Sequence, residues 1–292
     1  GAPRPRRIIR RMLLFPAMSI TVAAEELIYI GTYTRTTSQG IYAMRFDPNT
    51  GALGAPELVA QTPDPSFVSL SPSRNHLYAV SESNAMIVPF RIDPATRRLT
   101  PLPARSCDGK SPCYLAVDRT GRALIAANYH TGRVIILPIA TDGALGAPHP
   151  VRTHRGKSVH PTRQMAPHIH SATLSPNNRY AIICDLGLDK IFIYAFDPVR
   201  ASLTPAATPY VATAPGAGPR HFAFAPDGRH AFVINELDST LSSFAYEPAN
   251  GALTLLATHS TLPANFSGDN FPAEIRVHPN GHFVYGSNRG HD

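Results

Sequence analysis

Histidine, arginine and glutamate side chains recur at two places in a pattern of short apolar segments. One set lies where an apolar segment begins: His168, His170, Arg220, His221 and Glu274. The other set lies where the following apolar segment ends: Glu82, residues 128–130, Asp185, Asn235, Glu236 and residues 288–291. A neutral imidazole or a carboxylate can take a proton from water, and a guanidinium can bind a developing oxyanion. These residue types therefore fit acid–base chemistry on an oxygen-rich, anionic substrate.

The apolar segments belong to a repeat that runs along the whole chain. The first segment of each unit ends in a turn residue, and these residues recur 46 to 58 positions apart, at Pro72, Asp118, Pro176, Pro226 and Pro279. A second apolar segment follows each of them, and most units then continue with an Asp-Pro or Glu-Pro pair. Four short strands in a unit of this length are typical of a β-propeller. A β-sandwich would require the ordered recurrence of both anchors to be a coincidence. We therefore predict an all-β propeller of four-stranded antiparallel blades.

The phase of the repeat predicts the domain organisation. Complete units are expected at residues 65–105, 111–152, 167–210 and 218–259, with a His-rich extended loop at 149–167. The segment before them contains the second, third and fourth strands of a unit, and the segment after them contains only the first two. We therefore predict a single incomplete propeller domain over residues 26–292, with the last part of the ring absent from this chain.

Strand direction places the polar residues on one face of the ring. The first two strands of a unit are antiparallel neighbours, so the start of the first and the end of the second meet at the same face. The two sets of His, Arg, Glu and Asn residues should therefore converge there from every unit. The opposite face carries residues such as 73–75 and 227–229, which are ordinary turn formers.

Charge and hydropathy exclude several functional classes. Five arginines before residue 12 supply most of the net charge of +7, so the rest of the chain carries only about +2 and does not suggest a nucleic-acid surface. No apolar run is long enough for a membrane-spanning helix. Residues 1–25 form an N-terminal extension that is either a signal peptide, with its basic, apolar and small-residue parts, or an upstream artefact. A cytoplasmic location is expected, with export as the alternative.

The cysteines and the His-rich stretch leave two smaller questions. Cys107 and Cys113 are close enough in sequence to form a disulfide in an oxidising compartment, or all three cysteines are free thiols. The histidines between 149 and 170 are irregularly spaced and have no cysteine or acidic partner nearby, so we expect no metal site and no cofactor.

Specific motifs resemble those of a known family. Gly-Pro-Arg-His at 218–221 with Asn-Glu-Leu at 235–237, His-Ser at 170–171 and Asn-Arg-Gly-His at 288–291 closely resemble the lactonase family of seven-bladed propellers. That family includes bacterial 6-phosphogluconolactonases and fungal carboxymuconate-lactonizing enzymes, and the resemblance covers residues 27–292. It implies seven blades and a metal-free site formed by His170, Arg220, Glu236 and a second arginine, a role for which Arg289 and Arg276 compete. Residues 129–131 and the His-rich stretch depart from the family pattern, which leaves substrate choice open.

The resemblance implies hydrolysis of a small-molecule lactone, with 6-phosphogluconolactone as the expected substrate. Glu236 or His170 would activate water, and Arg220 would stabilise the oxyanion. The expected substrate-binding residues are Arg289, His221, His168, Glu274 and Asn235. Two readings remain as alternatives: a muconate-type lactonizing cycloisomerase using the same residues, and a non-catalytic propeller that binds a protein. Each polar residue also has a structural alternative, such as an Arg220–Glu236 ion pair that only bridges two strands.

Overall fold

The structure, a computed structural model, describes residues 26–291. The predictions made for residues 1–25 concern a segment outside this range. Regular structure within residues 26–291 is almost entirely β: 22 strands and one 3-10 turn, η1 (Leu186–Leu188). Within the described residues, no helix has the length and apolar character needed to cross a membrane. The frequent prolines and turn residues, which interrupt helices, account for strands of this length.

The strands form six antiparallel sheets that follow one another along the chain. The first sheet contains β1 (Glu26–Ile30), β2 (Gly40–Phe46) and β3 (Glu57–Gln61). The second contains β4 (Val68–Leu70), β5 (His76–Ser81), β6 (Met86–Ile92) and β7 (Leu99–Pro101), with β8 (Arg105–Ser106) also paired to β6. The third contains β9 (Pro112–Val117), β10 (Ala123–Asn128), β11 (Arg133–Pro138) and β12 (His149–Thr153).

The remaining sheets continue the same order. The fourth contains β13 (Ile169–Leu174), β14 (Tyr180–Asp185), β15 (Lys190–Asp197) and β16 (Ser202–Ala212). The fifth contains β17 (Pro219–Phe224), β18 (His230–Asn235), β19 (Thr240–Tyr246) and β20 (Leu253–Ser260). The sixth contains β21 (Ile275–Val277) and β22 (Val284–Gly286).

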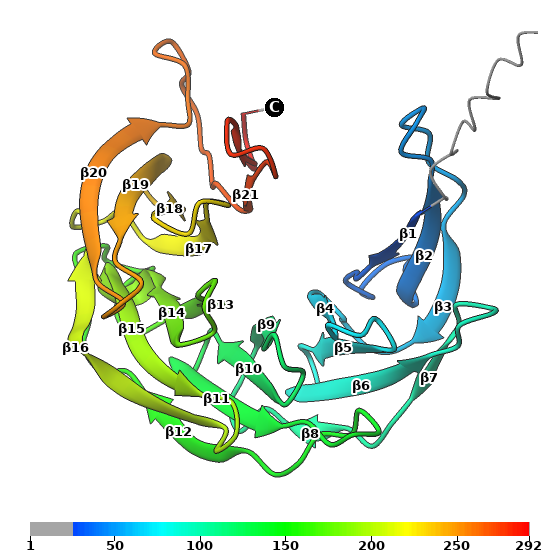
Figure 1. The fold of residues 1–292 in the computed structure, drawn as a ribbon. Coiled ribbons are helices and arrows are strands. Elements are labelled where there is room, and N and C mark those ends of the chain that lie inside the picture. The colour runs from blue at the N-terminus through cyan, green and yellow to red at the C-terminus, as the bar shows by residue number, and fades with distance from the viewer. Residues whose placement is uncertain (1–25, 292) are drawn as a thin grey trace, which may run out of the picture.

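The sheets are arranged radially around a common centre, as Figure 1 shows, with β4, β9, β13 and β17 nearest the centre and β12, β16 and β20 at the rim. The first sheet and β21 flank the open side of the arc. The predicted propeller of four-stranded antiparallel blades is therefore confirmed. One boundary differs from the prediction: residues 149–153 are not part of the His-rich loop. They form β12, because His149 and Thr153 pair with Ile136 and Arg133 and complete the third sheet.

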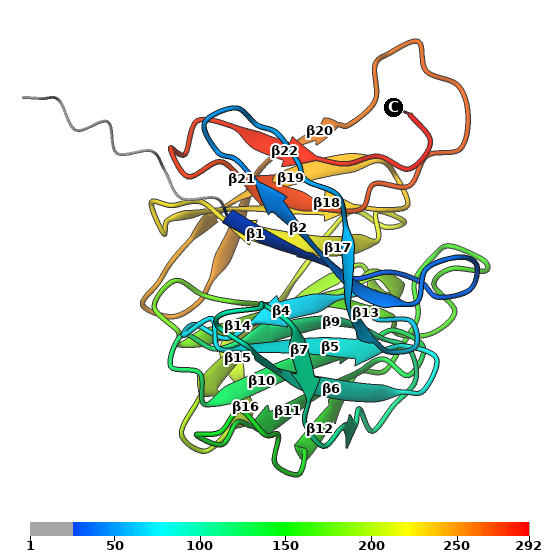
Figure 2. The ribbon, with the colours of Figure 1, turned by 90° about the vertical axis from the view of Figure 1, so that its right-hand side faces the viewer.

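The two faces of the ring differ in which strand ends lie there. The second strands of the sheets, such as β5 and β22, end toward the same face in Figure 2, on the right of that view. We call it the site face, and we call the opposite face, where the inner strands end in tight turns, the turn face. Tyr29, Arg119 and Arg276 line a channel cavity of about 760 Å³ on the turn-face side, together with residues of the inner strands.

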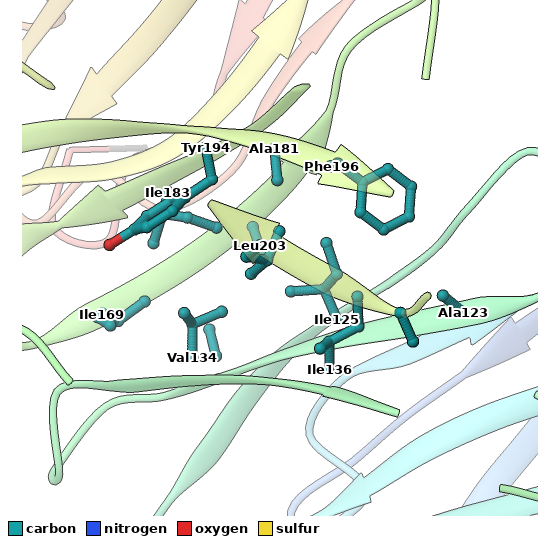
Figure 3. Packing of buried hydrophobic residues seen from close by; sticks show 13 residues of the cluster. Ala123, Ile125, Val134, Ile136, Ile169, Ala181, Ile183, Tyr194, Phe196 and Leu203 are labelled. Carbon is teal, nitrogen blue, oxygen red and sulfur yellow. The ribbon is translucent and has the colours of Figure 1, made fainter. Parts of the chain in front are cut away.

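Neighbouring sheets pack through large apolar side chains. All six residues of β10 and all six of β14 are buried, as expected for strands covered on both sides. Figure 3 shows Ile125 and Ile136 of the third sheet against Ile183, Phe196 and Leu203 of the fourth. Burying an aliphatic or aromatic side chain of this size contributes about 1.5–3 kcal/mol. These contacts between sheets give the site face a rigid support.

Candidate active site

A cavity of about 520 Å³ opens at the site face. It is lined by six of the eight predicted site residues: His170, Arg220, His221, Glu236, Glu274 and Arg289. Tyr33, Ser66, Glu82, Ser111, Tyr129 and Arg163 contribute to its walls as well. Polar residues separated by up to 256 positions in the chain, from Tyr33 to Arg289, therefore meet in one cavity. Strand direction predicts this meeting for the six site residues.

Glu236 is the centre of a cluster of arginines. Its side chain is only 4% exposed. The Nε of Arg220 donates to Oε2 at 2.7 Å, and the Nη2 of Arg289 donates to the same oxygen at 2.8 Å. The Nη2 of Arg163 donates to Oε1. One carboxylate therefore faces three guanidiniums, so this part of the cavity has a surplus of positive charge that suits an anionic substrate.

Local backbone structure explains the positions of Arg220 and Glu236. Gly218 has φ of +64°, a conformation that favours glycine, and its N–H donates to Oδ1 of Asp189 at 2.7 Å. A bulge between Pro219 and His221 then interrupts the pairing of β17 with β18. Glu236 directly follows β18, and its N–H donates to the carbonyl of Gly218 at 2.8 Å. The two motifs found in the sequence are thus hydrogen-bonded to each other.

Two histidines at the cavity are held neutral. Burial, reinforced by the positive charge of Arg220, holds the pKa of His170 well below its usual value. Burial also lowers the pKa of His221, although a hydrogen bond to Glu274, with Nδ1 and Oε2 3.3 Å apart, partly opposes this. The two imidazole rings lie 5.2 Å apart, centroid to centroid. At neutral pH each ring is therefore uncharged and has one unprotonated nitrogen, and the lowered pKa makes that nitrogen a weaker base than a solvent-exposed imidazole.

Cys113 lies beside His170, with 3.9 Å between Sγ and Nδ1. This pairing is not a nucleophilic Cys–His dyad. Burial raises the pKa of the Cys113 thiol to about 12, so the thiolate is not formed near neutral pH. The pair therefore closes the inner wall of the cavity and supplies no nucleophile.

The geometry distinguishes the two candidates for the second arginine. Arg289 reaches Glu236 and its Nε donates to the carbonyl of Phe271 at 2.9 Å. Arg276 is mostly exposed and forms an ion pair with Glu274, with 3.6 Å between Nε and Oε1. It lines the channel on the turn-face side. Arg289 is therefore the arginine that completes the cluster.

Two of the predicted substrate-binding residues do not line the cavity. Asn235 is buried, and its Nδ2 donates to Thr240 Oγ1 at 2.8 Å and to Ser242 Oγ at 3.1 Å within its own sheet. His168 is stacked on Tyr129, with 4.5 Å between ring centroids, so it supports the cavity wall from behind. The side chain of Asn235 is therefore used within its own sheet, whereas that of Glu236, which follows the strand, enters the cavity.

Other polar residues at strand ends also have structural partners. Asp185 accepts from His154 Nδ1 at 2.7 Å, and His154 Nε2 lies 3.0 Å from the hydroxyl of Tyr194. Asn128 is buried, and its Nδ2 donates to the carbonyl of Cys107 at 3.0 Å. Cys107, Cys113 and Cys184 are all free, which rules out the disulfide alternative. Over the described part of the chain, no group of three or more His, Cys, Asp or Glu residues could hold a metal ion.

Sequence reasoning missed Arg163. It lies in the loop between β12 and β13, outside both strand-end positions that define the site in every other sheet. Its side chain is 34% exposed and contacts Glu236, while its second partner is the hydroxyl of Tyr129 at 3.4 Å. Only the position of Arg163 within an unusual insertion could have drawn attention to it, because no repeat predicts where a loop will fold.

Comparison with known proteins is consistent with this arrangement. The family model described as "Lactonase, 7-bladed beta-propeller" matches residues 27–292. The chain belongs to the lactonase family of seven-bladed β-propellers. The 6-phosphogluconolactonase of Bacillus subtilis is 35% identical over 90% of this chain and 75% of its own length. The 6-phosphogluconolactonase of Serratia proteamaculans is 32% identical over 91% and 75%. The solved periplasmic gluconolactonase of Pseudomonas aeruginosa is 35% identical, with a TM-score of 0.86 over 91% of this chain and 76% of that one.

Family membership confirms the resemblance found in the motifs. These relatives are longer than this chain, which spans about three-quarters of each. The match covers all the cavity residues described above, from Tyr33 to Arg289. The site therefore belongs to the shared part of the lactonase fold.

Proposed function

We propose that this protein hydrolyses the lactone of a sugar acid, with 6-phosphogluconolactone as its preferred substrate and 6-phosphogluconate as the product. The observation that carries the proposal is the arginine cluster on Glu236 in a cavity that also contains a neutral His170. Relatives of this family named 6-phosphogluconolactonase and gluconolactonase support the same reaction class.

Arg220 is assigned to the developing oxyanion. Its side chain is 13% exposed, and its Nη1 also donates to the carbonyl of Ala273 at 2.5 Å, so its guanidinium is fixed before substrate arrives. When water attacks the lactone carbonyl, the carbonyl oxygen becomes negative. A fixed, partly desolvated guanidinium stabilises that charge without having to reorganise.

Glu236 is assigned as the general base. Oε2 accepts from Arg220 and Arg289, whereas Oε1 accepts only from Arg163. The side chain of Arg163 is more exposed than that of Arg220 and less exposed than that of Arg289. Oε1 is thus the atom that can take a proton from water and return it to the ring oxygen as the ring C–O bond breaks. His170, neutral at the same cavity, is the alternative base.

We also propose that the reaction takes place in the cytoplasm. Three cysteines remain free, and a reducing compartment is where such thiols persist. The periplasmic location of the Pseudomonas aeruginosa relative makes export the alternative. Fractionation of cells that produce the protein separates the two locations.

The test is the value of kcat/KM for 6-phosphogluconolactone in Glu236→Gln. Loss of a general base should lower it about 10²–10⁴-fold. Glu82→Gln is the matched control, because Glu82 lines the same cavity but binds Tyr33 and Ser66. It should stay within a few-fold of wild type. An unchanged rate in Glu236→Gln with a large loss in His170→Asn would transfer the role to His170. A wild-type protein inactive on 6-phosphogluconolactone, gluconolactone and muconolactone would refute the lactonase proposal.

A further inference from the structure

Arg163 differs from the other two arginines on Glu236 in how it is held. Arg220 and Arg289 each also donate to a backbone carbonyl, of Ala273 and Phe271 respectively. The guanidinium of Arg163 has the Tyr129 hydroxyl at 3.4 Å and the ring of Phe271 at 5.9 Å from its Cζ to the centroid. Both of these contacts are weak. The side chain of Arg163 is therefore the one in the cluster that can most readily change partner.

The backbone beneath Arg163 is firmly anchored. Its neighbour Gln164 is fully buried, and its Nε2 donates to the carbonyl of Leu186 at 2.8 Å and to Oδ1 of Asp189 at 2.7 Å. In the same loop, the hydroxyl of Ser158 donates to the other carboxylate oxygen of Asp189 at 2.5 Å. A buried polar network of this kind fixes a loop in one conformation.

Asp189 connects this loop to the rest of the site. Besides Gln164 and Ser158, it accepts from the N–H groups of Gly216 and Gly218, each at 2.7 Å. Gly218 opens the segment that carries Arg220. A single buried carboxylate thus holds two of the three segments that direct an arginine at Glu236, those of Arg163 and Arg220, so the insertion is a built part of the site.

The bonds to Glu236 are distributed unequally. Oε2 accepts from Arg220 and Arg289, while Oε1 accepts from Arg163 alone. As long as Arg163 stays there, it occupies one of the two lone-pair positions of Oε1 and neutralises part of the charge on that oxygen, which makes Oε1 a weaker acceptor for a proton from water. A dianionic group entering the cavity would attract the guanidinium with the fewest other bonds. The same movement would both bind the anion and release Oε1.

We propose that Arg163 is the residue that selects for an anionic group on the lactone, and that its transfer from Glu236 to that group exposes the base. This inference rests on the proposed lactonase function. Arg163 exchanges its hydrogen bond to Oε1 for one to a phosphate or carboxylate oxygen. The freed Oε1 takes a proton from the attacking water, whose oxygen bonds to the lactone carbonyl carbon. The ring C–O bond then breaks, and the proton passes to the ring oxygen.

The first experiment compares three substrates in wild type and Arg163→Gln: 6-phosphogluconolactone, gluconolactone and muconolactone, which carries a carboxylate. In Arg163→Gln, kcat/KM for 6-phosphogluconolactone should fall about 10- to 100-fold, the usual contribution of one charge-assisted hydrogen bond. The value for gluconolactone should stay the same or rise, because Oε1 is already exposed. A loss on muconolactone as well would show that Arg163 binds carboxylates and phosphates alike, and a loss confined to the phosphorylated lactone would restrict it to phosphate.

The second experiment supplies the anion separately from the substrate. Inorganic phosphate should accelerate hydrolysis of gluconolactone by wild type, after subtraction of enzyme-free blanks at the same phosphate concentration, and should not accelerate it in Arg163→Gln. Arg155→Gln is the matched control, because Arg155 is an exposed cation of the same loop and lies outside the cavity lining. It should behave like wild type in both experiments.

Two outcomes would overturn the proposal. In one, Arg163→Gln lowers kcat/KM equally for phosphorylated and plain lactones, which would indicate a structural role. In the other, the preference for the phosphorylated lactone is unchanged. Both differ from failure of the lactonase function itself, in which wild type hydrolyses none of the three substrates.

Discussion

The two faces of the ring use polar side chains in different ways. On the turn face, most partners of the turn side chains are local: Asp118 accepts from the N–H of Ala123 at 2.8 Å, and Ser175 Oγ accepts from the N–H of Tyr180 at 2.9 Å. A single bond to Asp118 comes from the next sheet, where Asn178 Nδ2 donates to Oδ2 at 3.1 Å. On the site face, Glu236 is bonded by side chains that lie 16, 53 and 73 positions away. The same repeat therefore ends mainly in local bonds on one face and in a cluster of bonds between sheets on the other.

This difference shows how a repeated unit acquires a site. A polar residue that satisfies its own turn stabilises one sheet and has no capacity left for a ligand. Glu236 gathers three side chains from different segments at the cavity, where a ligand can reach them. We therefore expect substitutions of turn-face carboxylates to affect stability alone, and substitutions in the cluster around Glu236 to affect chemistry and its pH dependence.

The largest stability effect is expected for Asp118→Ala. Asp118 is fully buried and its carboxylate accepts from the N–H groups of Thr120, Arg122 and Ala123. Removing it leaves buried donors unsatisfied and should lower the free energy of unfolding by about 2–4 kcal/mol. Denaturant unfolding measures this loss, and kcat/KM per folded molecule should remain within twofold of wild type.

Asp227→Ala is the control on the same face. Asp227 makes the equivalent bonds to the N–H groups of Arg229 and His230, but it is exposed, so water can replace them. We expect a loss below about 1 kcal/mol. Equal losses in the two variants would show that burial of the turn carboxylate does not determine how much free energy of unfolding is lost.

A change of pH should have a smaller but more specific effect on the stability of the fold. The folded-state pKa values of His170 and His221 lie below the unfolded value of about 6.5, so the unfolded chain binds more protons in mild acid. The stability that these histidines confer is complete above that value and is lost as the pH falls below it.

The pKa values of Asp118 and Asp227 on the turn face are lowered as well, although burial alone would raise that of Asp118. Their contribution is therefore kept until the pH falls below about 4.

Thermal unfolding between pH 7.5 and 5 measures this difference. The unfolding midpoint of wild type should decrease through pH 6, and His170→Asn should reduce that decrease. Asp227→Ala should leave the slope in this range unchanged. A slope that is the same in wild type and in His170→Asn would contradict the assignment of a buried, neutral histidine.

The parts of the site that follow the repeat were predictable from the sequence. Strand direction places His170, Arg220 and Glu236 on one face, and the structure brings them to one cavity. Residues 149–152 were predicted both as the end of the unit at 111–152 and as the start of the His-rich loop, because the segment contains a proline and no clear alternation. Pairing with β11 shows that they belong to the unit. Arg163 was not predictable either, because a loop is positioned by distant partners such as Asp189.

Asn235 shows a different kind of limit. It is adjacent to Glu236 and has the same polar character, so its place at the end of the strand suggested a substrate contact. In the structure Asn235 bonds instead to Thr240 and Ser242 of its own sheet. Strand alternation could not have separated the two, because Arg220 and His221 are also adjacent and both line the cavity.

The most direct test of the account is kcat/KM for 6-phosphogluconolactone in Arg220→Gln, measured beside Asp118→Ala and expressed per folded molecule. The account predicts a loss of about 10²–10³-fold in Arg220→Gln, the usual effect of removing one oxyanion donor, and a wild-type value in Asp118→Ala. A value of kcat/KM in Arg220→Gln within twofold of wild type would contradict the claim that the bonds between sheets on the site face perform the chemistry.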